Sequence, residues 1–355
     1  WLPLHHDMGL IGCLLMAAFT AGALALIPPE VFLARPAVWL RAISRFRAVG
    51  SPAPSFAFSL TAARVKDEEL AGLDLSSWKH ALNGAEPVSL ETLRRFTDRF
   101  APHGFDPASM QPVYGLSEAA LAVTFAPRRD GPLLAEAAGR AIASVGVPVP
   151  GVTIAIRGAE GQTLPLGQTG HIHVRGPSIM RGYFERPDAT AEVLREGWLD
   201  TGDLGFIRHG ELFVCGRAKD VIIIRGANHA PSTFEEALDG VTGVRVGCTV
   251  ALGQRSEGTE ESLLLLVETT REATPGLPAR IASVVAERTG IRPGQVVLLA
   301  PGTLPRTSSG KLRRQEARRR YLAGTLTPPE AVTGLLLLKE LFRSAAGHAL
   351  ARGGA

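Results

Sequence analysis

The sequence predicts an α/β protein that carries a β-barrel-like subdomain and ends in a small C-terminal α+β domain. Three observations lead to this prediction. Amphipathic helices alternate with short apolar strands at residues 36–121, which is typical of α/β architecture. Short strands separated by Gly and Pro follow at residues 142–214. A mixed helix and strand pattern begins near residue 221, and 355 residues suffice for two domains with separate cores.

The first element is an uncharged run at residues 8–27, long enough to be considered as a membrane span. Three glycines interrupt this run, and a Pro-Pro pair ends it without a basic or aromatic anchor. We therefore expect a helix at residues 10–19, a turn near Gly22 and a strand at residues 23–27. Together they would form a buried helix–strand pair of an α/β core, in preference to a membrane helix.

The next elements alternate between helix and strand. Apolar residues at helical spacing predict helices at residues 36–46 and 90–100. Short strands are expected at residues 48–51, 81–84 and 112–115, the last two running into Gly turns. Alternating units imply a mostly parallel sheet whose ligands bind at the carboxyl ends of the strands.

The later elements belong to the β-rich and C-terminal regions. Strands are expected in the β-rich region at residues 153–156, 171–174 and 212–214. The C-terminal domain should contain a helix at 232–238, strands at 245–252 and 263–268, and a helix at 278–288, before a linker at 325–329. Residues 330–355 could form one amphipathic helix. We place the boundaries of these regions at residues 1–126, 127–218, 219–324 and 325–355.

Composition narrows the class of protein. Hydrophobic residues make up 45% and charged residues 20%, as in ordinary globular proteins. A net charge of +4 gives no argument for a nucleic-acid partner, and the basic run at residues 313–320 is expected to be a solvated helix face. Three widely spaced cysteines without a CxxC pair argue against a disulfide scaffold and a zinc cluster, so we expect a cytoplasmic protein.

The chain begins at Trp1 without a basic segment, so we expect no signal peptide and a position inside a longer protein.

Several short motifs occur in a fixed order along the chain. They are WLPLHHDMGL at residues 1–10, NGAEP at 83–87, YGLSE at 114–118, TGD at 201–203, GRAKD at 216–220, IRGANH at 224–229 and SGK at 309–311. Together they resemble the acyl-adenylate-forming superfamily of acyl-CoA synthetases, adenylation domains and luciferases. The first and sixth motifs look most like its branch of fatty-acyl-AMP and fatty-acyl-CoA ligases. The resemblance covers residues 1–322.

This resemblance implies a fold and an activity. The chain would be the remainder of a large α/β AMP-binding domain, its β-rich subdomain and a small mobile C-terminal domain. The implied enzyme is an AMP-forming acid–thiol ligase. It activates a fatty acid with ATP and Mg²⁺ to acyl-AMP, releases pyrophosphate, and transfers the acyl group to CoA or to a carrier-protein phosphopantetheine. We expect neither a nucleic-acid partner nor a membrane span.

The nucleotide residues combine a flat ring with polar groups. A Tyr that leads into a Gly turn offers a face for adenine, and the resemblance implies that Tyr114, followed by Gly115, stacks on the base. It also implies a second wall of the adenine site, made by Asn83, Gly84, Ala85 and Glu86. Ser117 supplies a hydroxyl for a phosphate oxygen, and Glu118 supplies a carboxylate for Mg²⁺.

Asp203 and Arg217 complete the implied nucleotide site. Asp203 is an acceptor suited to two ribose hydroxyls, and Arg217 is a cation that could reach the ribose or a phosphate. Taken singly, the first would be a turn residue and the second a surface charge. Their place in the ordered set of motifs favours the functional interpretation.

Lys311 is the expected catalytic cation. Attack of a carboxylate on the α-phosphate brings two negative groups together, and an ammonium group stabilises that transition state. The resemblance implies this role for Lys311. A P-loop is rejected because Leu312 replaces the Ser or Thr that would hold Mg²⁺ and no Gly stands at the required earlier position.

Three further residues receive roles from the resemblance alone. Lys219 corresponds to the hinge about which the C-terminal domain swings. Gly226 lies beside the path of the thiol acceptor. His6 corresponds to a gating residue near the acyl pocket, with a packed histidine as the alternative.

The sequence departs from the family pattern in four places. The Ser/Thr/Gly-rich loop that cradles the β- and γ-phosphates does not occur in these residues, so we expect the chain alone to have little or no adenylation activity. Ser55 stands where Asn is usual, and Ala230 where an aromatic is usual. Residues 125–145 are shorter than the insertion typical of fatty-acyl-AMP ligases, which favours a CoA ligase. A fatty-acyl-AMP ligase and an inactive binding remnant stay open as alternatives.

Overall fold

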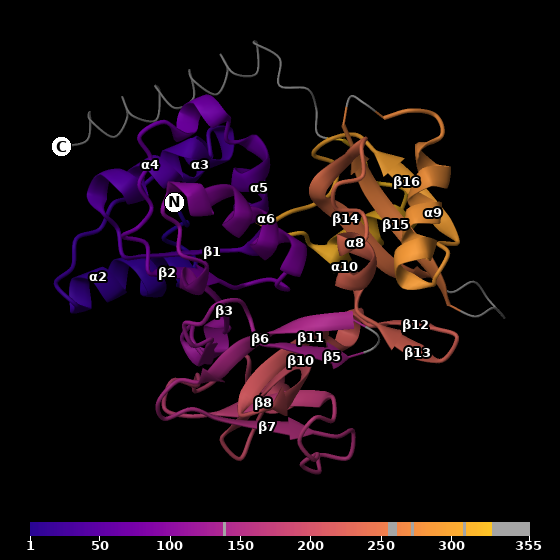
Figure 1. The fold of residues 1–355 in the computed structure, drawn as a ribbon. Coiled ribbons are helices and arrows are strands. Elements are labelled where there is room, and N and C mark those ends of the chain that lie inside the picture. Colours follow the sequence, from indigo (N-terminus) through magenta and orange to yellow (C-terminus); the bar gives the residue numbers. More distant parts are fainter. Residues whose placement is uncertain (138–139, 255–260, 271–272, 308–309, 329–355) are drawn as a thin grey trace, which may run out of the picture.

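The computed structural model describes residues 1–137, 140–254, 261–270, 273–307 and 310–328. These residues form a large part that ends at β11 and a C-terminal unit that begins after it (Figure 1).

The large part contains most of the helices and the main sheet. Its helices are α1(Asp7–Gly9), the π-helix η1(Leu10–Leu15), α2(Met16–Phe19), α3(Pro29–Ala34), α4(Ala37–Phe46), α5(Ser55–Arg64), η2(Asp67–Leu70), α6(Leu90–Phe100), η3(Ala101–His103), η4(Pro107–Ser109), η5(Ser117–Ala119) and α7(Pro187–Val193). Its strands are β1(Gly50–Ala53), β2(His80–Asn83), β3(Met110–Tyr114), β4(Thr124–Phe125), β5(Leu134–Ala137), β6(Arg140–Pro148), β7(Thr153–Arg157), β8(Gly170–Arg175), β9(Leu194–Arg195), β10(Trp198–Arg208) and β11(Glu211–Arg217).

One continuous sheet joins the α/β and β-rich regions. Its strand order is β1-β2-β3-β4-β6-β11-β10-β8-β7, with β5 on β6 and β9 on β10. β1, β2 and β3 are parallel, and every later pairing is antiparallel. The predicted mixture of a parallel α/β sheet and a β-rich subdomain is therefore confirmed, and the two meet at β3–β4.

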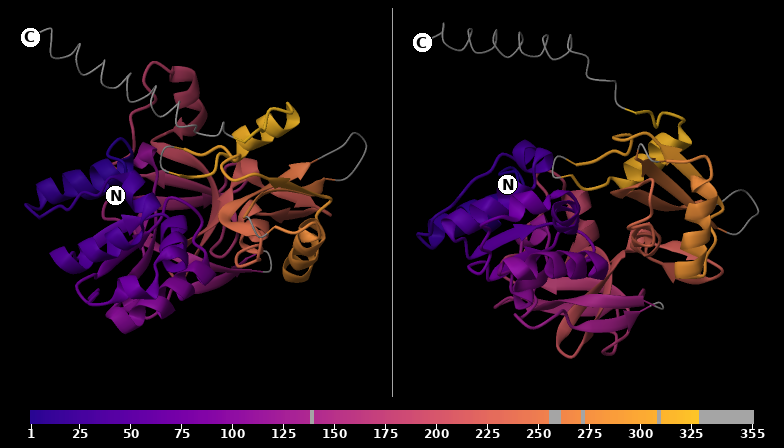
Figure 2. Two further views of the ribbon diagram at one scale, coloured as in Figure 1. Left: turned by 90° about the horizontal axis from the view of Figure 1, so that it is seen from above. Right: turned by 45° about the horizontal axis from the view of Figure 1, so that its top comes forward.

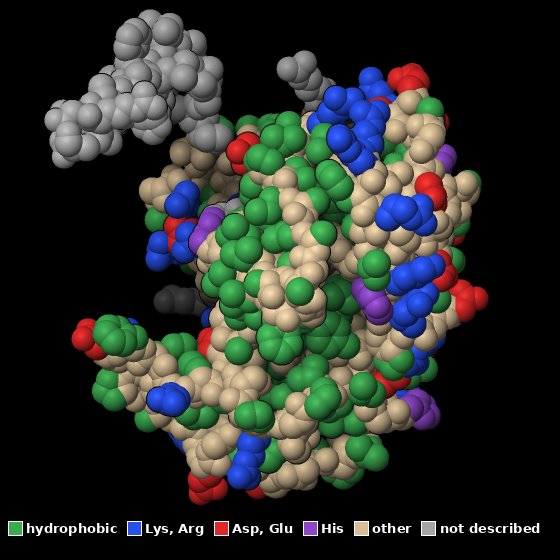
Figure 3. Space-filling model, turned by 90° about the vertical axis from the view of Figure 1, so that its left-hand side faces the viewer, with side chains coloured by type: hydrophobic (Ala, Val, Ile, Leu, Met, Phe, Trp, Pro, Cys, Tyr) green, Lys and Arg blue, Asp and Glu red, His purple; other side chains and the backbone are tan. Residues whose placement is uncertain are grey.

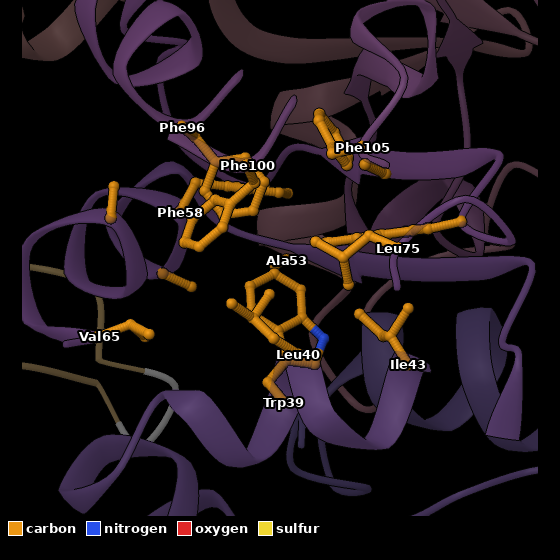
Figure 4. Close-up of a cluster of buried hydrophobic side chains, with 14 of the residues drawn as sticks. Trp39, Leu40, Ile43, Ala53, Phe58, Val65, Leu75, Phe96, Phe100 and Phe105 are labelled. Atoms are coloured by element: carbon orange, nitrogen blue, oxygen red, sulfur yellow. The ribbon is translucent and has the colours of Figure 1, made fainter. Parts of the chain in front are cut away.

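An aromatic core fixes the parallel strands beneath their helices. Trp39 of α4 packs edge-on against Trp78 with ring centroids 5.1 Å apart. Phe58 of α5 meets Phe96 of α6 with ring centroids 5.0 Å apart (Figure 4). All four rings are almost fully buried. Edge-to-face contacts of this kind add to the free energy gained by burying the rings. They hold β1–β3 in place, and the carboxyl ends of these strands point toward the site.

The first apolar run differs from its prediction. A helix is present at residues 7–19, but Gly9 is its one buried residue and Phe19 is 91% exposed. The predicted strand at residues 23–27 is wrong: the segment has no regular secondary structure and pairs with no strand among the described residues, and Leu26 is 56% exposed. The apolar sequence predicted that this segment is buried. Within the described residues, however, no strand pairs with it and no other element packs over it. Hydrophobic side chains therefore gather on this face (Figure 3).

Other elements match or extend the predictions. The helices predicted at 36–46 and 90–100 are confirmed, the first beginning one residue later at Ala37. The strands predicted at 48–51, 81–84 and 112–115 shift by one or two residues. Several elements were not predicted, among them α3, α5, α7 and the long strands β6 and β10. Among the described residues, no helix is long and apolar enough to cross a lipid bilayer.

The C-terminal unit has its own sheet and core. Its elements are η6(Ala218–Asp220), β12(Ile222–Ile224), β13(Ala227–His229), α8(Pro231–Glu236), β14(Val244–Gln254), β15(Ser262–Thr269), α9(Leu277–Thr289), β16(Gln295–Leu299) and α10(Arg314–Leu322). The sheet order is β14-β15-β16, and β12 pairs with β13 in a separate hairpin. Figure 2 shows this unit beside the large part in two further views. The predicted α+β character is confirmed, and the predicted tail helix lies outside the described residues.

Candidate active site

A large cavity lies between the large part and the C-terminal unit. Its volume is about 1910 Å³, whereas small-molecule sites usually measure roughly 300–1,000 Å³. Tyr114, Asp203 and Arg217 line it from the large part, and Lys311 lines it from the C-terminal unit. Four residues separated by almost 200 positions in the sequence are thus brought to one space.

The centre of the polar wall is a hydrogen-bonded pair. The Tyr114 hydroxyl donates to Oδ2 of Asp203 at 2.6 Å, and Nε of Arg217 lies 3.4 Å from Oδ1 of the same carboxylate. Asp203 of β10 and Arg217 of β11 lie directly opposite each other in the antiparallel register of these two strands. Burial raises the pKa of Asp203, while the bond from Tyr114 and the charge of Arg217 oppose this rise. Burial, with the nearby carboxylate, holds the pKa of Tyr114 well above its ordinary value.

Two glycines allow the strand ends to approach closely. A Cβ at Gly115 would lie 1.6 Å from the carbonyl oxygen of Leu121, and a Cβ at Gly84 would lie 2.6 Å from Cγ2 of Val113. A side chain at either position would push the loops apart. Ala85, which follows Gly84, has a φ of +73°, which is uncommon for a residue with a side chain. It lies on the cavity wall.

The NGAEP segment contributes unequally to the cavity. Ala85 and Glu86 line it, whereas Asn83 and Gly84 lie behind the wall. Asn83 is fully buried, and its Oδ1 accepts a bond from Ser55 Oγ at 2.9 Å. Asn83 is therefore placed to support the wall, and its predicted direct contact with adenine stays a prediction.

Lys311 lines the same cavity from the C-terminal unit. Burial lowers the pKa of its ammonium group, and the charges of Glu86 and Asp7 oppose the lowering. Glu86 accepts a bond from the backbone N–H of Phe56 at 2.5 Å, and burial raises its pKa although Lys311 opposes this. The Lys311 charge also acts with burial to lower the pKa of His6, so the two predicted catalytic residues lie near each other.

The loop that carries Lys311 touches the large part directly. Gly310 has a φ of +88°, and a Cβ built on it would lie 3.1 Å from Cζ of Phe56. The absence of a side chain at position 310 therefore permits the contact between the C-terminal unit and the large part.

Ser117 and Glu118 have partners that the sequence motifs did not reveal. Ser117 Oγ donates to Oδ2 of Asp7 at 2.7 Å, and the hydroxyl of Tyr183 donates to Oε1 of Glu118 at 2.8 Å. These contacts span 110 and 65 residues of sequence, so no local pattern indicated them. Within the described residues, no group of three or more His, Cys, Asp or Glu side chains is arranged to hold a metal ion. Glu118 is thus available as a single carboxylate ligand, not as part of a preformed cage.

The hinge and thiol-path residues lie in different surroundings. Lys219 lies in the short helix η6 between β11 and β12 and lines the cavity. Gly226 lies at the turn between β12 and β13, away from the cavity wall, with a φ of +74°. The structure therefore brings Lys311 to the shared cavity while the hairpin with Gly226 lies outside it.

The comparison with sequence families decides the class of protein. The family described as "AMP-binding enzyme" matches residues 1–184, just over half of the chain. The chain belongs to this family.

Individual relatives agree with this family assignment. The chain is 37% identical over 349 residues to a protein of Caulobacter vibrioides that bears the name of an acyl-CoA synthetase, covering 92% of this chain and 61% of that protein. The chain spans about 60% of the length of the curated relatives that it matches.

Solved structures of AMP-binding enzymes share the fold. A structure from a study of fatty acyl-adenylate ligases of E. coli and L. pneumophila matches with 35% identity and a TM-score of 0.83, over 91% of this chain and 61% of that chain. The fatty acyl-adenylate ligase of L. pneumophila in complex with acyl adenylate and pyrophosphate has 31% identity and the same 91% coverage of this chain, with 62% of its own. Its TM-score is only 0.62. The two solved structures cover the same share of this chain but differ in TM-score. This difference indicates that parts of the second structure are arranged differently from the corresponding parts of this chain.

Proposed function

We propose that this AMP-binding chain belongs to an enzyme that activates a fatty acid with ATP to acyl-AMP and then transfers the acyl group to the thiol of CoA. The observation that carries the proposal is the shared cavity, in which Lys311 of the C-terminal unit faces the Tyr114–Asp203–Arg217 wall of the large part. A cation opposite a nucleoside-type pocket is the arrangement that adenylation requires.

The nucleoside is proposed to bind along this wall. Tyr114 offers its ring to adenine beside Ala85, and Asp203 accepts hydrogen bonds from the ribose. Arg217 is exposed enough to reach a ribose or phosphate oxygen. Gly115 and Gly84 keep the loops close enough for the backbone to approach the base.

Mg²⁺ fits this site as a partner of phosphate oxygens. The ion accepts one or two protein carboxylates and completes its shell with phosphate and water, so the single carboxylate of Glu118 matches its preference. When bound, Mg²⁺ would neutralise charge on the phosphates. The Tyr183 hydroxyl donates a hydrogen bond to one carboxylate oxygen of Glu118. The Ser117 hydroxyl donates a hydrogen bond to the carboxylate of Asp7.

Lys311 is proposed to act in the first step. An oxygen of the fatty acid carboxylate forms a bond to the α-phosphorus of ATP, and the bond from that phosphorus to the pyrophosphate oxygen breaks. Negative charge accumulates on the non-bridging oxygens, and the Lys311 ammonium stabilises it. The charges of Glu86 and Asp7 favour the protonated lysine that this role needs. His6 lies at the same end of the cavity and would border the entering acid.

The second step is proposed to follow rotation of the C-terminal unit about Lys219. The hairpin that carries Gly226 lies outside the cavity in this structure, so its approach to a thiol acceptor requires another arrangement. The unequal TM-scores of the two ligase structures support the existence of more than one arrangement.

The acceptor has a second candidate. Two of the solved relatives carry the name of fatty acyl-adenylate ligases, which favours delivery to a carrier-protein phosphopantetheine. The shortness of residues 125–145 favours CoA. Mixing acyl-AMP with free CoA and a protein that contains this chain together with a phosphate loop separates the two: release of AMP supports CoA, and its absence supports the carrier.

The binding proposal is tested on the chain itself by calorimetry with AMP and ATP. Because the proposed contacts involve base and sugar, both nucleotides should bind with affinities that agree within about threefold. Tight ATP binding that depends on the γ-phosphate would contradict the proposed site. Binding of neither nucleotide would contradict the proposed nucleoside site.

A further inference from the structure

The loop before Lys311 is attached to an irregular stretch of β14. The pairing of β14 with β15 skips from Val244–Thr269 to Thr249–Val267, so residues 245–248 form a bulge. Gly247 has a φ of +64° within this bulge. A bulge takes backbone groups out of the strand ladder and directs them elsewhere.

Arg306 occupies the space between the bulge and the loop. Its Nη2 donates to the carbonyl oxygen of Gly247 at 2.8 Å and to Sγ of Cys248 at 3.0 Å. Its Nη1 donates to the carbonyl oxygen of Gly310 at 2.6 Å. One planar guanidinium thus joins the strand to the residue immediately before Lys311.

The rest of the loop is closed locally. Thr307 N donates to the carbonyl oxygen of Lys311 at 2.8 Å, and Lys311 N donates to Oγ1 of Thr307 at 3.1 Å. Arg306 and Leu312 pair as an isolated antiparallel bridge. These bonds give the loop its shape, whereas the guanidinium bonds fix its position on the sheet.

We propose that Arg306 is a positioning residue for Lys311: it holds the loop on the β14 bulge so that Gly310 meets Phe56 and the Lys311 ammonium reaches the cavity. The inference rests on the proposed function, because it assigns Lys311 to the reaction. Lysine at position 306 would keep the charge but lose the planar fork that bridges separate acceptors.

The test uses the chain with Arg306→Lys, Lys311→Ala and the double variant. The matched control is Arg318→Lys, which makes the same change at an exposed arginine of α10. The first measurement is hydrogen exchange in peptides that contain Thr307, Gly310 and Lys311. Exchange should be roughly tenfold faster in Arg306→Lys than in the control, at an unchanged melting temperature. Unchanged exchange would overturn the proposal.

The second measurement is affinity for a non-hydrolysable acyl-sulfamoyl adenosine. Arg306→Lys and Lys311→Ala should each weaken binding roughly tenfold, because both remove the ammonium from the same place. If Arg306 acts through Lys311, the double variant should bind within about twofold of Lys311→Ala. Additive losses would overturn the positioning role.

The two measurements separate the possible failures. If Lys311→Ala leaves affinity for this analogue unchanged, or the chain does not bind it, the proposed function fails at Lys311. The exchange measurement then still decides whether Arg306 fixes the loop. If Lys311→Ala weakens binding and Arg306→Lys does not, the proposed function stands and the positioning proposal is wrong.

Discussion

At the scale of single residues, the site is organised around one carboxylate. Asp203 accepts the short bond from Tyr114, faces Arg217 and is almost fully buried. A carboxylate that is kept charged in such surroundings depends on its partners, because burial alone favours the neutral form. The proposed ribose contact should therefore respond to pH and to the loss of the Tyr114 hydroxyl.

We expect adenosine binding to weaken as the pH falls through the raised pKa of Asp203, because the protonated carboxyl loses acceptor capacity. Adenosine is chosen because it lacks a phosphate that titrates. Asp203→Asn should lower affinity roughly tenfold at neutral pH and should remove this dependence. Calorimetry between pH 4.5 and 8 measures both effects.

Tyr114→Phe supplies the matched control for the direction of this effect. The variant keeps the ring but removes the bond that lowers the Asp203 pKa, so the weakening should begin at a higher pH. A shift toward lower pH, or a pH dependence that persists in Asp203→Asn, would show that another group is responsible.

For helices and strands, a strong hydrophobic periodicity in the sequence was sufficient to predict the element, and a weak periodicity was not. α6 has apolar residues on one face and polar residues on the other, and its predicted bounds match the structure. α5, with the sequence SFAFSLTAAR, has apolar residues all around and was missed. β10 contains Gly and Asp, which are poor strand residues, but its neighbours β8 and β11 impose the strand.

The same limit applies to the site. Local motifs predicted Tyr114, Asp203 and Lys311, and all three line the cavity. The contacts of Asp7 with Ser117, of Tyr183 with Glu118 and of Arg306 with the β14 bulge each join segments that are far apart in the sequence. Those contacts are set by the packing of the whole chain, so a sequence without its relatives contains no signal for them.

The boundary between α8 and α6 offers a prediction about stability. Asp239 follows α8, and burial raises its pKa to about 6 from an ordinary value of 3.8. Arg95 of α6 and Arg288 favour its charged form, whereas Glu91 of α6 and Glu235 disfavour it. The folded protein therefore holds a proton between pH 3.8 and 6 that the unfolded chain releases, so this group lowers the free energy of unfolding as the pH rises.

Asp239→Asn should remove the decrease in the free energy of unfolding that Asp239 causes as the pH rises. Near pH 4 the variant and the wild type should differ little, and near pH 7.5 the variant should be more stable by about 1–2 kcal/mol, allowing for partial solvent screening. Urea unfolding at both pH values measures the difference. Asp130→Asn, at an exposed aspartate, is the control. A variant that is less stable than the wild type at pH 7.5 would contradict the assignment.

At the scale of the whole molecule, the apolar face formed by η1, α2 and the following segment is the most unusual surface. Leu15, Met16, Phe19, Leu24 and Leu26 are all exposed there. Figure 3 shows hydrophobic side chains gathered on one face of the molecule. β1 lies at one end of the main sheet beside this region. A contiguous apolar surface and an open strand edge favour self-association.

The chain should therefore bind a hydrophobic dye and associate in a concentration-dependent way. Leu15→Ser combined with Phe19→Ser should lower dye fluorescence by roughly half or more and shift the sedimentation profile toward monomer. Neither residue lines the cavity, so adenosine affinity should not change. Phe184→Ser is the control, because Phe184 is similarly exposed and lies in the turn before α7 rather than in residues 10–27. Equal effects of both substitutions would mean that the face has no special role.

The contact between Gly310 and Phe56 has a consequence for protein engineering. A single added methyl group at position 310 would act as a wedge, since it would meet the ring at 3.1 Å and would also disfavour the backbone at a φ of +88°. Trimming Phe56 to alanine would remove the first obstacle and leave the second. The pair of positions thus forms an adjustable spacer, with which the separation of the two bodies could be set by one or two carbon atoms at a time.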